Sequence, residues 1–268
     1  MLKSGQVRLG ILLVVATTVF AVLGPLLAPY DPLESVGLGY APPGAGFLLG
    51  TDNLGRDVWS RVLSGGLSLA WMAPISTVVG TIVGTAIGLM AAFRGGWIDA
   101  ALMRSMEVLL AFPGILFALM FVSILGPQPW LLVVIITVSV IPGCARVIRG
   151  ASLPVVTSEF VLWDRAVGIR GWRILAGDVF PNITSPLMVE FGIRLMVSVG
   201  LLASLSFIGY GIQPPTPDWG LMVSENRTGL AVQPLAVLAP MALIVLFTVG
   251  GNLMAEGAAR VIGRTDGK

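Results

Sequence analysis

The stretch "LSLAWMAPISTVVGTIVGTAIGLMAAF", residues 67–93, contains no ionisable side chain. A helix crosses the hydrocarbon core of a membrane in about 20 residues, so this stretch is long enough to span it. The rest of the chain has the same character: of its 268 residues, 56% are hydrophobic and 11% are charged, and its mean hydropathy is +0.92. Charged residues make up about 25% of an average soluble domain. The composition therefore predicts an integral membrane protein.

Further apolar runs of comparable length lie on either side of this stretch. Together they predict six transmembrane helices, at residues 8–29, 67–93, 100–125, 129–150, 185–211 and 232–254. A β-barrel is disfavoured because barrel strands are about ten residues of alternating pattern, whereas these runs are long and continuous. The first run is too long for the apolar part of a secretory signal, and no clear small-x-small cleavage site follows it. We therefore expect an all-α fold in which the first run is a permanent helix.

The positions of Lys and Arg predict the orientation of these helices. If the N-terminus is cytoplasmic, the cytoplasmic segments hold twelve of the 16 basic residues, the outer segments hold three, and Arg194 lies within the fifth span. Cytoplasmic segments of membrane proteins carry an excess of Lys and Arg, so we expect both termini in the cytoplasm. The net charge of +2 reflects this orientation and gives no reason to expect nucleic acid binding. The cytoplasmic set is Lys3, Arg8, Arg94, Arg104, Arg146, Arg149, Arg165, Arg170, Arg173, Arg260, Arg264 and Lys268, and the outer set is Arg56, Arg61 and Arg227.

Several kinds of chemistry are excluded by residue usage. The chain has no His and a single Cys, Cys144, so it cannot form a His/Cys metal site, a Cys–His nucleophile or an internal disulfide. The G-x-x-x-x-G-K-[ST] phosphate loop is also absent, because the only Gly-Lys pair is Gly267-Lys268. We therefore expect no catalytic residue, no metal site and no cofactor in this chain. Driven transport would take its energy from an ion gradient or from another subunit.

The stretch "EFVLWDRAVGIRGWRI", residues 159–174, interrupts the apolar runs between the fourth and fifth spans. A helix is expected over residues 158–166, because Ser158 is a good N-cap residue and the acidic residue after it suits the positive end of the helix dipole. Gly168 then permits a turn, and a second short helix is expected over residues 171–181. The result is a polar hairpin within the cytoplasmic segment 151–183.

Three aromatic side chains in this hairpin, Phe160, Trp163 and Trp172, would be apolar anchors exposed to the cytoplasm. An amphipathic helix laid into a groove of a partner protein is a common mode of recognition, so the hairpin suits a docking element. The alternative is an interfacial helix whose aromatic residues lie among the lipid headgroups. The residues alone leave both readings open.

The segment "EFVLWDRAVGIRGWRILAGDVFPN" resembles the cytoplasmic "EAA" loop of ATP-binding-cassette importer permeases. Three further stretches resemble the C-type permease subunit of the peptide/nickel branch: "LGTDNLGRDVWSRVLSGG" (49–66), "GGWIDAALMRSMEVLLAFP" (95–113) and "LSFIGYGIQPPTPDWG" (205–220). The resemblance covers nearly the whole chain. The positions that match the loop pattern are Glu159, Phe160, Val161, Arg165, Gly168, Pro181 and Asn182.

Membership of this family implies a six-helix permease that forms half of a translocation path. Its implied partners are a second paralogous permease, two cytoplasmic ATPases that bind ATP and Mg, an extracytoplasmic binding protein and the lipid of a bacterial inner membrane. The hairpin would be the coupling helix that docks on one ATPase. Its implied contact residues are Glu159, Phe160, Trp163, Asp164, Arg165, Gly168 and Trp172.

The coupling segment also departs from the family pattern. Trp163 and Asp164 stand where the family commonly carries two alanines, and Val167 stands in for the usual Leu. Either the partner's cleft has compensating space and charge, or this docking contact is weaker. The chain as a whole divides into residues 1–66, a helix plus an outer amphipathic elbow, and residues 67–268, a five-helix core with the coupling loop.

The outer elbow is expected to contain a short amphipathic helix within residues 49–66. Asn53 or Thr51 can cap it, and Asp57 and Arg61 would form an i,i+4 pair on its polar face. We expect this helix to lie along the outer membrane surface as a structural element, with a contact to the binding protein as the alternative. Its apolar face would consist of Val58, Trp59, Val62 and Leu63.

The proline-rich stretch "QPPTPDWG" forbids regular helix and predicts a stiff outer loop. Asp218 and Trp219 in this loop are candidates for contact with a delivered solute or its binding protein, against the alternative of a plain loop anchor. Pro113 and Pro142 are expected to interrupt the third and fourth spans with kinks.

Within the membrane, Gly80, Gly84 and Gly88 are spaced to form a helix-packing seam. Ionised groups in apolar spans must face protein or water, which makes Glu190 and Arg194 candidates for the translocation path. The alternative is that these two residues, spaced i,i+4, only neutralise each other. Glu107 is expected to pair locally with Arg104 or to reach the membrane surface.

The sequence thus predicts an ATP-driven importer permease, with an ion-gradient-driven secondary transporter as the alternative. Secondary transporters often contain inverted repeats, and residues 1–134 and 135–268 resemble each other too little to support one. The absence of His counts against a third hypothesis, a membrane-embedded hydrolase. The solute is left open among dipeptides, oligopeptides, glutathione, nickel complexes and haem.

Overall fold

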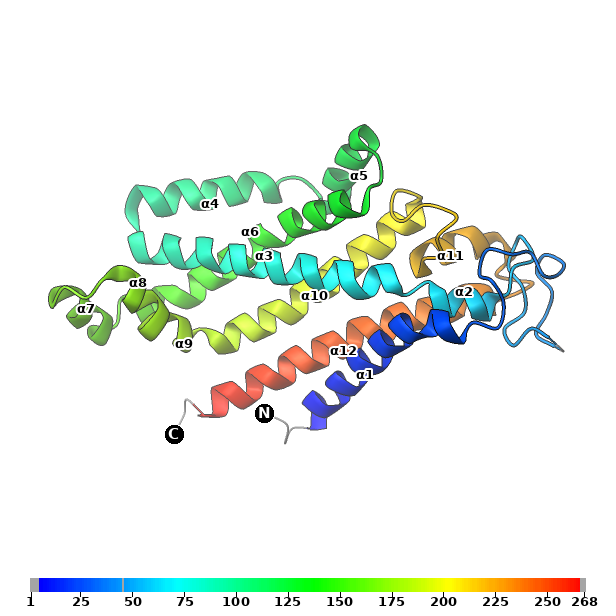
Figure 1. The fold of residues 1–268 in the computed structure, drawn as a ribbon. Helices are drawn as coiled ribbons and strands as arrows, with labels where there is room; N and C mark the ends of the chain where they lie inside the picture. Colours follow the sequence, from blue (N-terminus) through cyan, green and yellow to red (C-terminus); the bar gives the residue numbers. More distant parts are fainter. Residues whose placement is uncertain (1–4, 45, 266–268) are drawn as a thin grey trace.

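The computed structural model describes residues 5–44 and 46–265, which form a bundle of long helices without a β-strand among them (Figure 1). Five helices are long and apolar enough to cross a membrane, and six if one bent pair counts as a single span. The five are α1 (Gly5–Leu23), α3 (Leu67–Arg94), α6 (Pro129–Val156), α10 (Thr184–Ile208) and α12 (Leu235–Thr265). The predicted fold class is confirmed, and each predicted span overlaps a helix or the bent pair.

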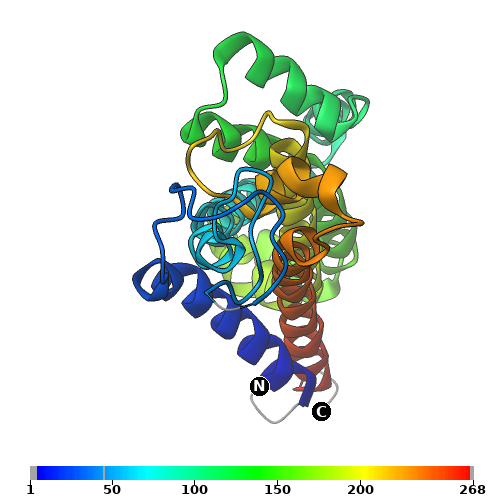
Figure 2. The ribbon, with the colours of Figure 1, turned by 90° about the vertical axis from the view of Figure 1, so that its right-hand side faces the viewer.

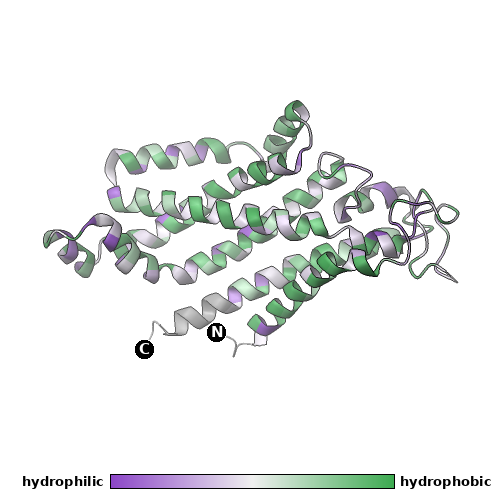
Figure 3. Cartoon of the chain, viewed as in Figure 1, coloured by the Kyte–Doolittle hydropathy of each residue, from purple (hydrophilic) through white to green (hydrophobic). Residues whose placement is uncertain are grey.

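The two ends of the bundle differ in character. One end, here called the hairpin end, carries residues 157–183, and α1 begins and α12 ends on the same side (Figure 1). The opposite end, here called the loop end, consists of residues 28–66 and 209–234. Hydrophilic residues gather at both ends, whereas the helices between them are mainly apolar (Figure 3). This distribution is the one that a membrane-spanning bundle requires.

The bent pair consists of α4 (Gly96–Leu110) and α5 (Gly114–Leu125), which meet at an angle of 76°. Pro113 explains the break, because proline has no N–H to donate and its ring disfavours the helical conformation of the residue before it. The predicted interruption of the third span is therefore confirmed. At Pro142, by contrast, α6 continues as one helix with the proline inside it, so the fourth span has no break there, and the kink stays a prediction.

The predicted glycine seam lies between α3 and α6. A Cβ atom added at Gly84 would lie 2.8 Å from Cβ of Cys144, and one added at Gly88 would lie 2.6 Å from the carbonyl oxygen of Ala145. At Gly80 the nearest atom would be Cγ1 of Val140, at 2.7 Å. The two helix backbones therefore approach so closely that only glycine fits at these positions.

A second set of close approaches, which the sequence analysis did not identify, holds α12 against α1 and α10. A Cβ atom at Gly250 of α12 would lie 2.7 Å from Cβ of Leu13, and one at Gly251 would lie 2.6 Å from Cδ2 of Leu195. Viewed along the bundle, α1 and α12 lie on one side and α4 and α5 on the opposite side (Figure 2). The face formed by α4 and α5 is therefore not covered by α1 or α12.

The seam predicts a specific response to substitution. Gly84→Ala should lower the free energy of unfolding by about 1–3 kcal/mol, because the added methyl group forces α3 and α6 apart. Gly150→Ala is the matched control, since no atom lies within 4 Å of a Cβ at Gly150 in α6. Thermal unfolding in detergent, followed by tryptophan fluorescence, measures both. Equal stability of the two variants would contradict the packing role of the seam.

Candidate functional site

The 157–183 hairpin protrudes from the bundle between α6 and α10 (Figure 1). Its first helix is α7 (Glu159–Ala166), which confirms the predicted helix and places Glu159 in the first turn. Its second arm is α8 (Gly171–Ile174), a π-helical turn η2 (Leu175–Val179) and α9 (Phe180–Asn182). The predicted second helix over residues 171–181 is therefore present, but it changes from α-helical to π-helical geometry over residues 175–179.

The turn between the two arms depends on Gly168. Its φ angle is +82°, a left-handed conformation that glycine adopts without strain. The Ile169 N–H donates to the Asp164 carbonyl oxygen at 3.0 Å and the Gly168 N–H donates to that of Arg165 at 3.2 Å, which is the Schellman pattern of a helix end. The predicted cap at the other end of α7 is wrong in one respect, because the Ser158 hydroxyl donates to the Val155 carbonyl at 2.6 Å and does not cap the helix.

The base of the hairpin is a small apolar core. Val161, Ile174 and Val179 are fully buried and pack with Ala92 and Val156, near the ends of α3 and α6. This core joins both arms of the hairpin to the two helices of the glycine seam. A displacement of the hairpin would therefore act directly on α3 and α6.

Arg165 is directed toward α3. Its guanidinium donates to the Phe93 carbonyl oxygen at 3.1 Å and lies 4.1 Å from the centroid of the Phe93 ring. The position of the ring also restricts Gly171, because a Cβ there would lie 2.9 Å from Cε1 of Phe93. Arg165 is thus a tie between the hairpin and α3, a role that the loop pattern alone did not reveal.

The outer side of the hairpin is apolar and aromatic. The exposed fractions of Phe160, Trp163 and Trp172 are 49%, 68% and 62%. Charge lies beside this surface, because the Arg173 guanidinium is 5.3 Å from the centroid of the Trp172 ring. Elsewhere in the hairpin, burial and the carboxylate of Asp164 raise the pKa of Asp178. We call these three aromatic residues the aromatic tip. Their exposure agrees with both expected settings, a partner's groove or the lipid headgroups.

Glu190 and Arg194 form an ion pair on α10, with Oε1 and Nε 2.5 Å apart. The guanidinium of Arg194 rests on Gly143 of α6, where a Cβ would lie 2.5 Å from its Cζ. Glu190 is buried, and Arg194 retains some exposure. The pairing predicted from the i,i+4 spacing is present, so the membrane contains no isolated charge at this point. On α4, Arg104 and Glu107 also form the expected local pair, at 3.2 Å.

Asp218 and Trp219 do not lie in an exposed outer loop, contrary to the sequence prediction. Both are buried at the start of α11 (Trp219–Asn226). The Asp218 carboxylate caps this helix by accepting from the N–H groups of Gly220 and Leu221, and the Trp219 indole N–H donates to the Val62 carbonyl at 2.8 Å. Trp219 therefore anchors α11 to α2, Asp218 caps α11 from within, and neither side chain is available for contact with a delivered solute in this conformation.

The outer elbow forms helix α2 (Val58–Ser64), whose cap is Asp57 and not the predicted Asn53 or Thr51. The predicted apolar face is buried except at Trp59, which is only partly buried. The ring centroid of Trp59 lies 5.9 Å from that of Phe20 in α1. The apolar face of the helix packs inside the protein, and its position along the outer membrane surface stays a prediction. The fully buried members of the face are Val58, Val62 and Leu63.

The polar side of α2 belongs to a buried network of four charges that was not predicted. Arg61 pairs with Asp52 at 2.5 Å and with Glu225 at 2.8 Å, and not with Asp57 as its spacing suggested. Arg56 also pairs with Asp52, at 2.7 Å, and with Glu225, at 3.0 Å. Because Glu225 belongs to α11, the network joins the elbow to the far end of the sequence.

Comparison with known proteins decides the family. The model of the family "Binding-protein-dependent transport system inner membrane component" matches residues 84–265, which include the whole hairpin. The chain belongs to this family. It is a permease subunit of an ATP-binding-cassette transport system, so an ion-gradient-driven carrier is not favoured.

Individual relatives agree with this assignment. The chain is 38% identical over 216 residues to the glutathione transport system permease protein GsiD of Pectobacterium atrosepticum, covering 80% of this chain and 71% of that protein. It is 33% identical over 263 residues to a putative peptide transport system permease protein of Brucella suis biovar 1, covering 98% and 88%. The inward-facing structure of the MetNI methionine ABC transporter shares the fold, with a TM-score of 0.65 and 15% identity over 75% of this chain and 96% of that one.

The buried Asp218 carboxyl predicts a pH dependence of stability. Burial raises its pKa from the ordinary 3.8 to about 6, so the folded protein holds this proton more tightly than the unfolded chain does. Stability should therefore fall by about 3 kcal/mol as the pH rises from about 4 to about 6. Asp218→Asn keeps a capping oxygen and removes the charge, so it should unfold at a higher temperature than wild type at pH 7.5 and at the same temperature at pH 4. A variant less stable than wild type at pH 7.5 would contradict this account.

The Glu190–Arg194 pair predicts a strongly non-additive mutant cycle. Either Glu190→Ala or Arg194→Ala leaves one charge stranded in the membrane and should cost about 3–5 kcal/mol, whereas the double variant should recover most of this loss. The yield of folded protein in detergent, with its unfolding temperature, measures the coupling. Losses that simply add would show that the two groups act independently.

Proposed function

We propose that this chain is one of two paralogous permease subunits of an ATP-driven importer for peptides, glutathione or similar small solutes. Relatives that are named for glutathione and peptide transport support the solute class, and the family supports partners that bind the solute and hydrolyse ATP. The observation that carries the coupling role is the hairpin. Its aromatic tip is exposed while its base is packed on the ends of α3 and α6.

The complex would contain a second permease, two ATP-binding-cassette ATPases with bound ATP and Mg, and an extracytoplasmic binding protein, in a bacterial inner membrane. The permease itself would carry no nucleotide site, no catalytic residue and no cofactor. The excess of basic residues would place the hairpin end, and with it both termini, in the cytoplasm. Residues 1–66 would then be an accessory helix and elbow on a five-helix core of residues 67–268.

In the coupling step, the aromatic tip would insert into a cleft of one ATPase. Aromatic side chains in a desolvated pocket supply much of the binding energy of such interfaces. Closure of the two ATPases on ATP would displace the tip, and the apolar core at the base would pass this displacement to α3 and α6. The tie between Arg165 and Phe93 would keep the hairpin from swinging independently of α3.

The atypical Trp163 and Asp164 define the cleft that this hairpin needs. A Trp that is 68% exposed requires more room than a methyl group, and a carboxylate beside it favours a basic residue on the ATPase. Glu159, exposed in the first turn of α7, adds a second negative charge to this side. Arg173 brings a positive charge to the tip, with its guanidinium 5.3 Å from the Trp172 ring. The hairpin would therefore match a dedicated ATPase whose cleft is wider than an alanine-bearing loop requires and carries charges complementary to both signs.

If the aromatic tip docks on the ATPase, removal of one of its side chains should weaken that binding. Trp163→Ala should weaken binding of the ATPase to the permease by tenfold or more, in keeping with the cost of at least about 2 kcal/mol for an interface hot spot. Trp97→Ala is the matched control, because this Trp at the start of α4 is 79% exposed and lies outside the hairpin. Pull-down and titration of the purified ATPase against each variant in nanodiscs measure the affinity. Equal binding by both variants would exclude the tip as the docking surface.

If the turn at Gly168 holds the hairpin in its coupling geometry, a substitution there should reduce the stimulation of ATP hydrolysis by solute. A β-branched side chain is strained at the positive φ of Gly168, so Gly168→Val should abolish most of the solute-stimulated ATP hydrolysis of the complex. Gly177→Ala in the second arm is the control, because no atom lies within 4 Å of a Cβ there and its φ is not positive. Wild-type stimulation in the Gly168→Val complex would mean that this hairpin does not transmit the ATPase motion.

A further inference from the structure

A groove of about 200 Å³ lies between α10, α11 and α12, close to the loop end. Small residues make room for it, among them Ser204 of α10 and Gly220 of α11. Larger apolar side chains form its walls, and those of Phe207, Met241 and Val245 are exposed. The groove is therefore open at the surface of the bundle.

A cation stands at the end of this groove that is nearest to the loop end. The Arg227 guanidinium lies 6.0 Å from the centroid of the Phe207 ring, which lines the groove. Gly220 and Val223 also line it, and Arg227 follows them at the helical spacing of three and then four residues. Arg227 begins the 3-10 turn η3 (Arg227–Gly229), which directly continues α11. All three residues therefore share one side of α11 and its continuation.

The charge of Arg227 is not balanced by a carboxylate of the chain, as far as the structure describes it. The other two arginines of the loop end, Arg56 and Arg61, belong to the buried network, in which two carboxylates match their charges. Arg227 is exposed and forms no ion pair with any described residue. An arginine above an apolar surface near the end of a spanning helix favours an anion that stays at the membrane–water boundary.

Exposed apolar side chains continue from the groove toward the middle of both spanning helices. On α12, Val249 follows Met241 and Val245 at steps of four residues, and on α10, Met196 lies three turns before Phe207. These rows are about 12 Å and about 16 Å long, at 1.5 Å per residue. One leaflet supplies half of a hydrocarbon layer that is about 30 Å thick. The apolar surface thus has the length of one layer of acyl chains.

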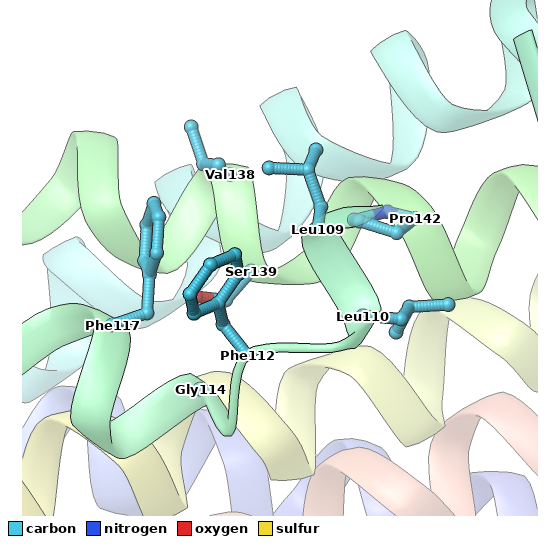
Figure 4. A pocket seen from close by; sticks show the side chains of 8 residues that line it. All are labelled: Leu109, Leu110, Phe112, Gly114, Phe117, Val138, Ser139 and Pro142. Atoms are coloured by element: carbon cyan, nitrogen blue, oxygen red, sulfur yellow. The ribbon is translucent and has the colours of Figure 1, made fainter. Parts of the chain in front are cut away.

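The hollow at the break between α4 and α5 differs from this groove (Figure 4). Its walls include Phe112 and Phe117, and no charged residue lines it. It also lies against Val138 and Pro142, at the middle of α6. A lipid headgroup stays at the membrane surface and would not reach that depth. An apolar surface that ends at a cation is therefore a feature of the groove beside Arg227 and not of this hollow.

We propose that the groove between α10, α11 and α12 binds one phospholipid of the leaflet at the loop end. An acyl chain lies in the groove and along the apolar rows, and the phosphate accepts hydrogen bonds from Arg227. Arginine suits this role because its planar guanidinium can bond two phosphate oxygens at once. The bound lipid joins α11 to the two spanning helices. This inference rests on the membrane-spanning bundle and not on the proposed importer function.

A helix of another subunit is the competing occupant. Helix interfaces within membranes are enriched in small residues, whereas Phe207, Met241 and Val245 at the mouth of the groove are large. Such a helix would also cover Arg227 without neutralising it, unless it carried an acidic residue at the same height. A phospholipid supplies both the apolar chain and the anion, in the order in which the groove presents their partners.

Native mass spectrometry of the delipidated full-length chain tests the contact with the headgroup. The probes are dioleoylphosphatidylglycerol and dioleoylglycerol, which has the same chains without the phosphate. Arg227→Gln should weaken binding of the phospholipid about tenfold, in keeping with the loss of a charge-assisted hydrogen bond, and leave dioleoylglycerol binding unchanged. Arg170→Gln is the matched control, because it removes the same charge from an exposed position in the hairpin. Excess glycerol 3-phosphate, a headgroup without chains, should not displace the phospholipid.

A second pair of variants tests the groove itself. Val245→Trp places a bulky side chain at its mouth and should weaken binding of both lipids. Leu246→Trp is the control, since this neighbouring residue of α12 is 40% exposed and does not line the groove. Equal binding by the two variants would show that the lipid lies elsewhere.

Photo-crosslinking identifies the occupant in an intact membrane. Met241→p-benzoylphenylalanine in the full-length chain, expressed with its partner subunits in bacteria, should gain the mass of one phospholipid on irradiation. Arg227→Gln should lower the yield of this adduct, but not that of the adduct at Ile82→p-benzoylphenylalanine, a 63% exposed position on α3. A cross-link from position 241 to another protein would show that a subunit fills the groove. That result, unchanged phospholipid affinity in Arg227→Gln, or displacement of the lipid by glycerol 3-phosphate overturns the assignment.

Discussion

The contact between the backbones of α3 and α6 is the constraint on which the rest of the structure depends. In a bilayer the lipid chains are as apolar as the side chains, so helices associate through close packing and not through exclusion of water. Glycine at three successive turns of α3 allows this packing over much of the length of both helices. Helices α4 and α10 then lie against both members of the pair, and the hairpin is built on their ends.

Features set by local rules could be predicted from the sequence. The spans follow from the length of the apolar runs, the break at Pro113 follows from a missing N–H, and the turn at Gly168 follows from a positive φ angle. The glycine seam also follows from spacing on one helix. Partners that are distant in sequence could not be predicted: Arg61 pairs with a carboxylate 164 residues away, and spacing alone suggested Asp57.

The candidate sites divide in the same way. The polar surroundings of Phe160, Trp163 and Trp172 were enough to predict their exposure, and the i,i+4 spacing was enough to predict the pair on α10. The orientation of Arg165 depends on a residue 72 positions earlier. Asp218 and Trp219 looked like loop residues because prolines precede them, but Asp218 caps α11 and Trp219 is buried against α2. The approach of α11 to α2 is a property of the assembled loop end.

The division of the hairpin into a packed base and an exposed tip has a consequence for how such transporters diversify. Phe160, Trp163 and Trp172 are about half exposed or more, so the aromatic tip contributes little to folding. The base residues are buried and contribute most of the hairpin's stability. Side chains at the tip can therefore change without loss of the fold. If the tip docks on the ATPase as proposed, a cell with several importers of this kind could keep each permease with its own ATPase through a few substitutions there.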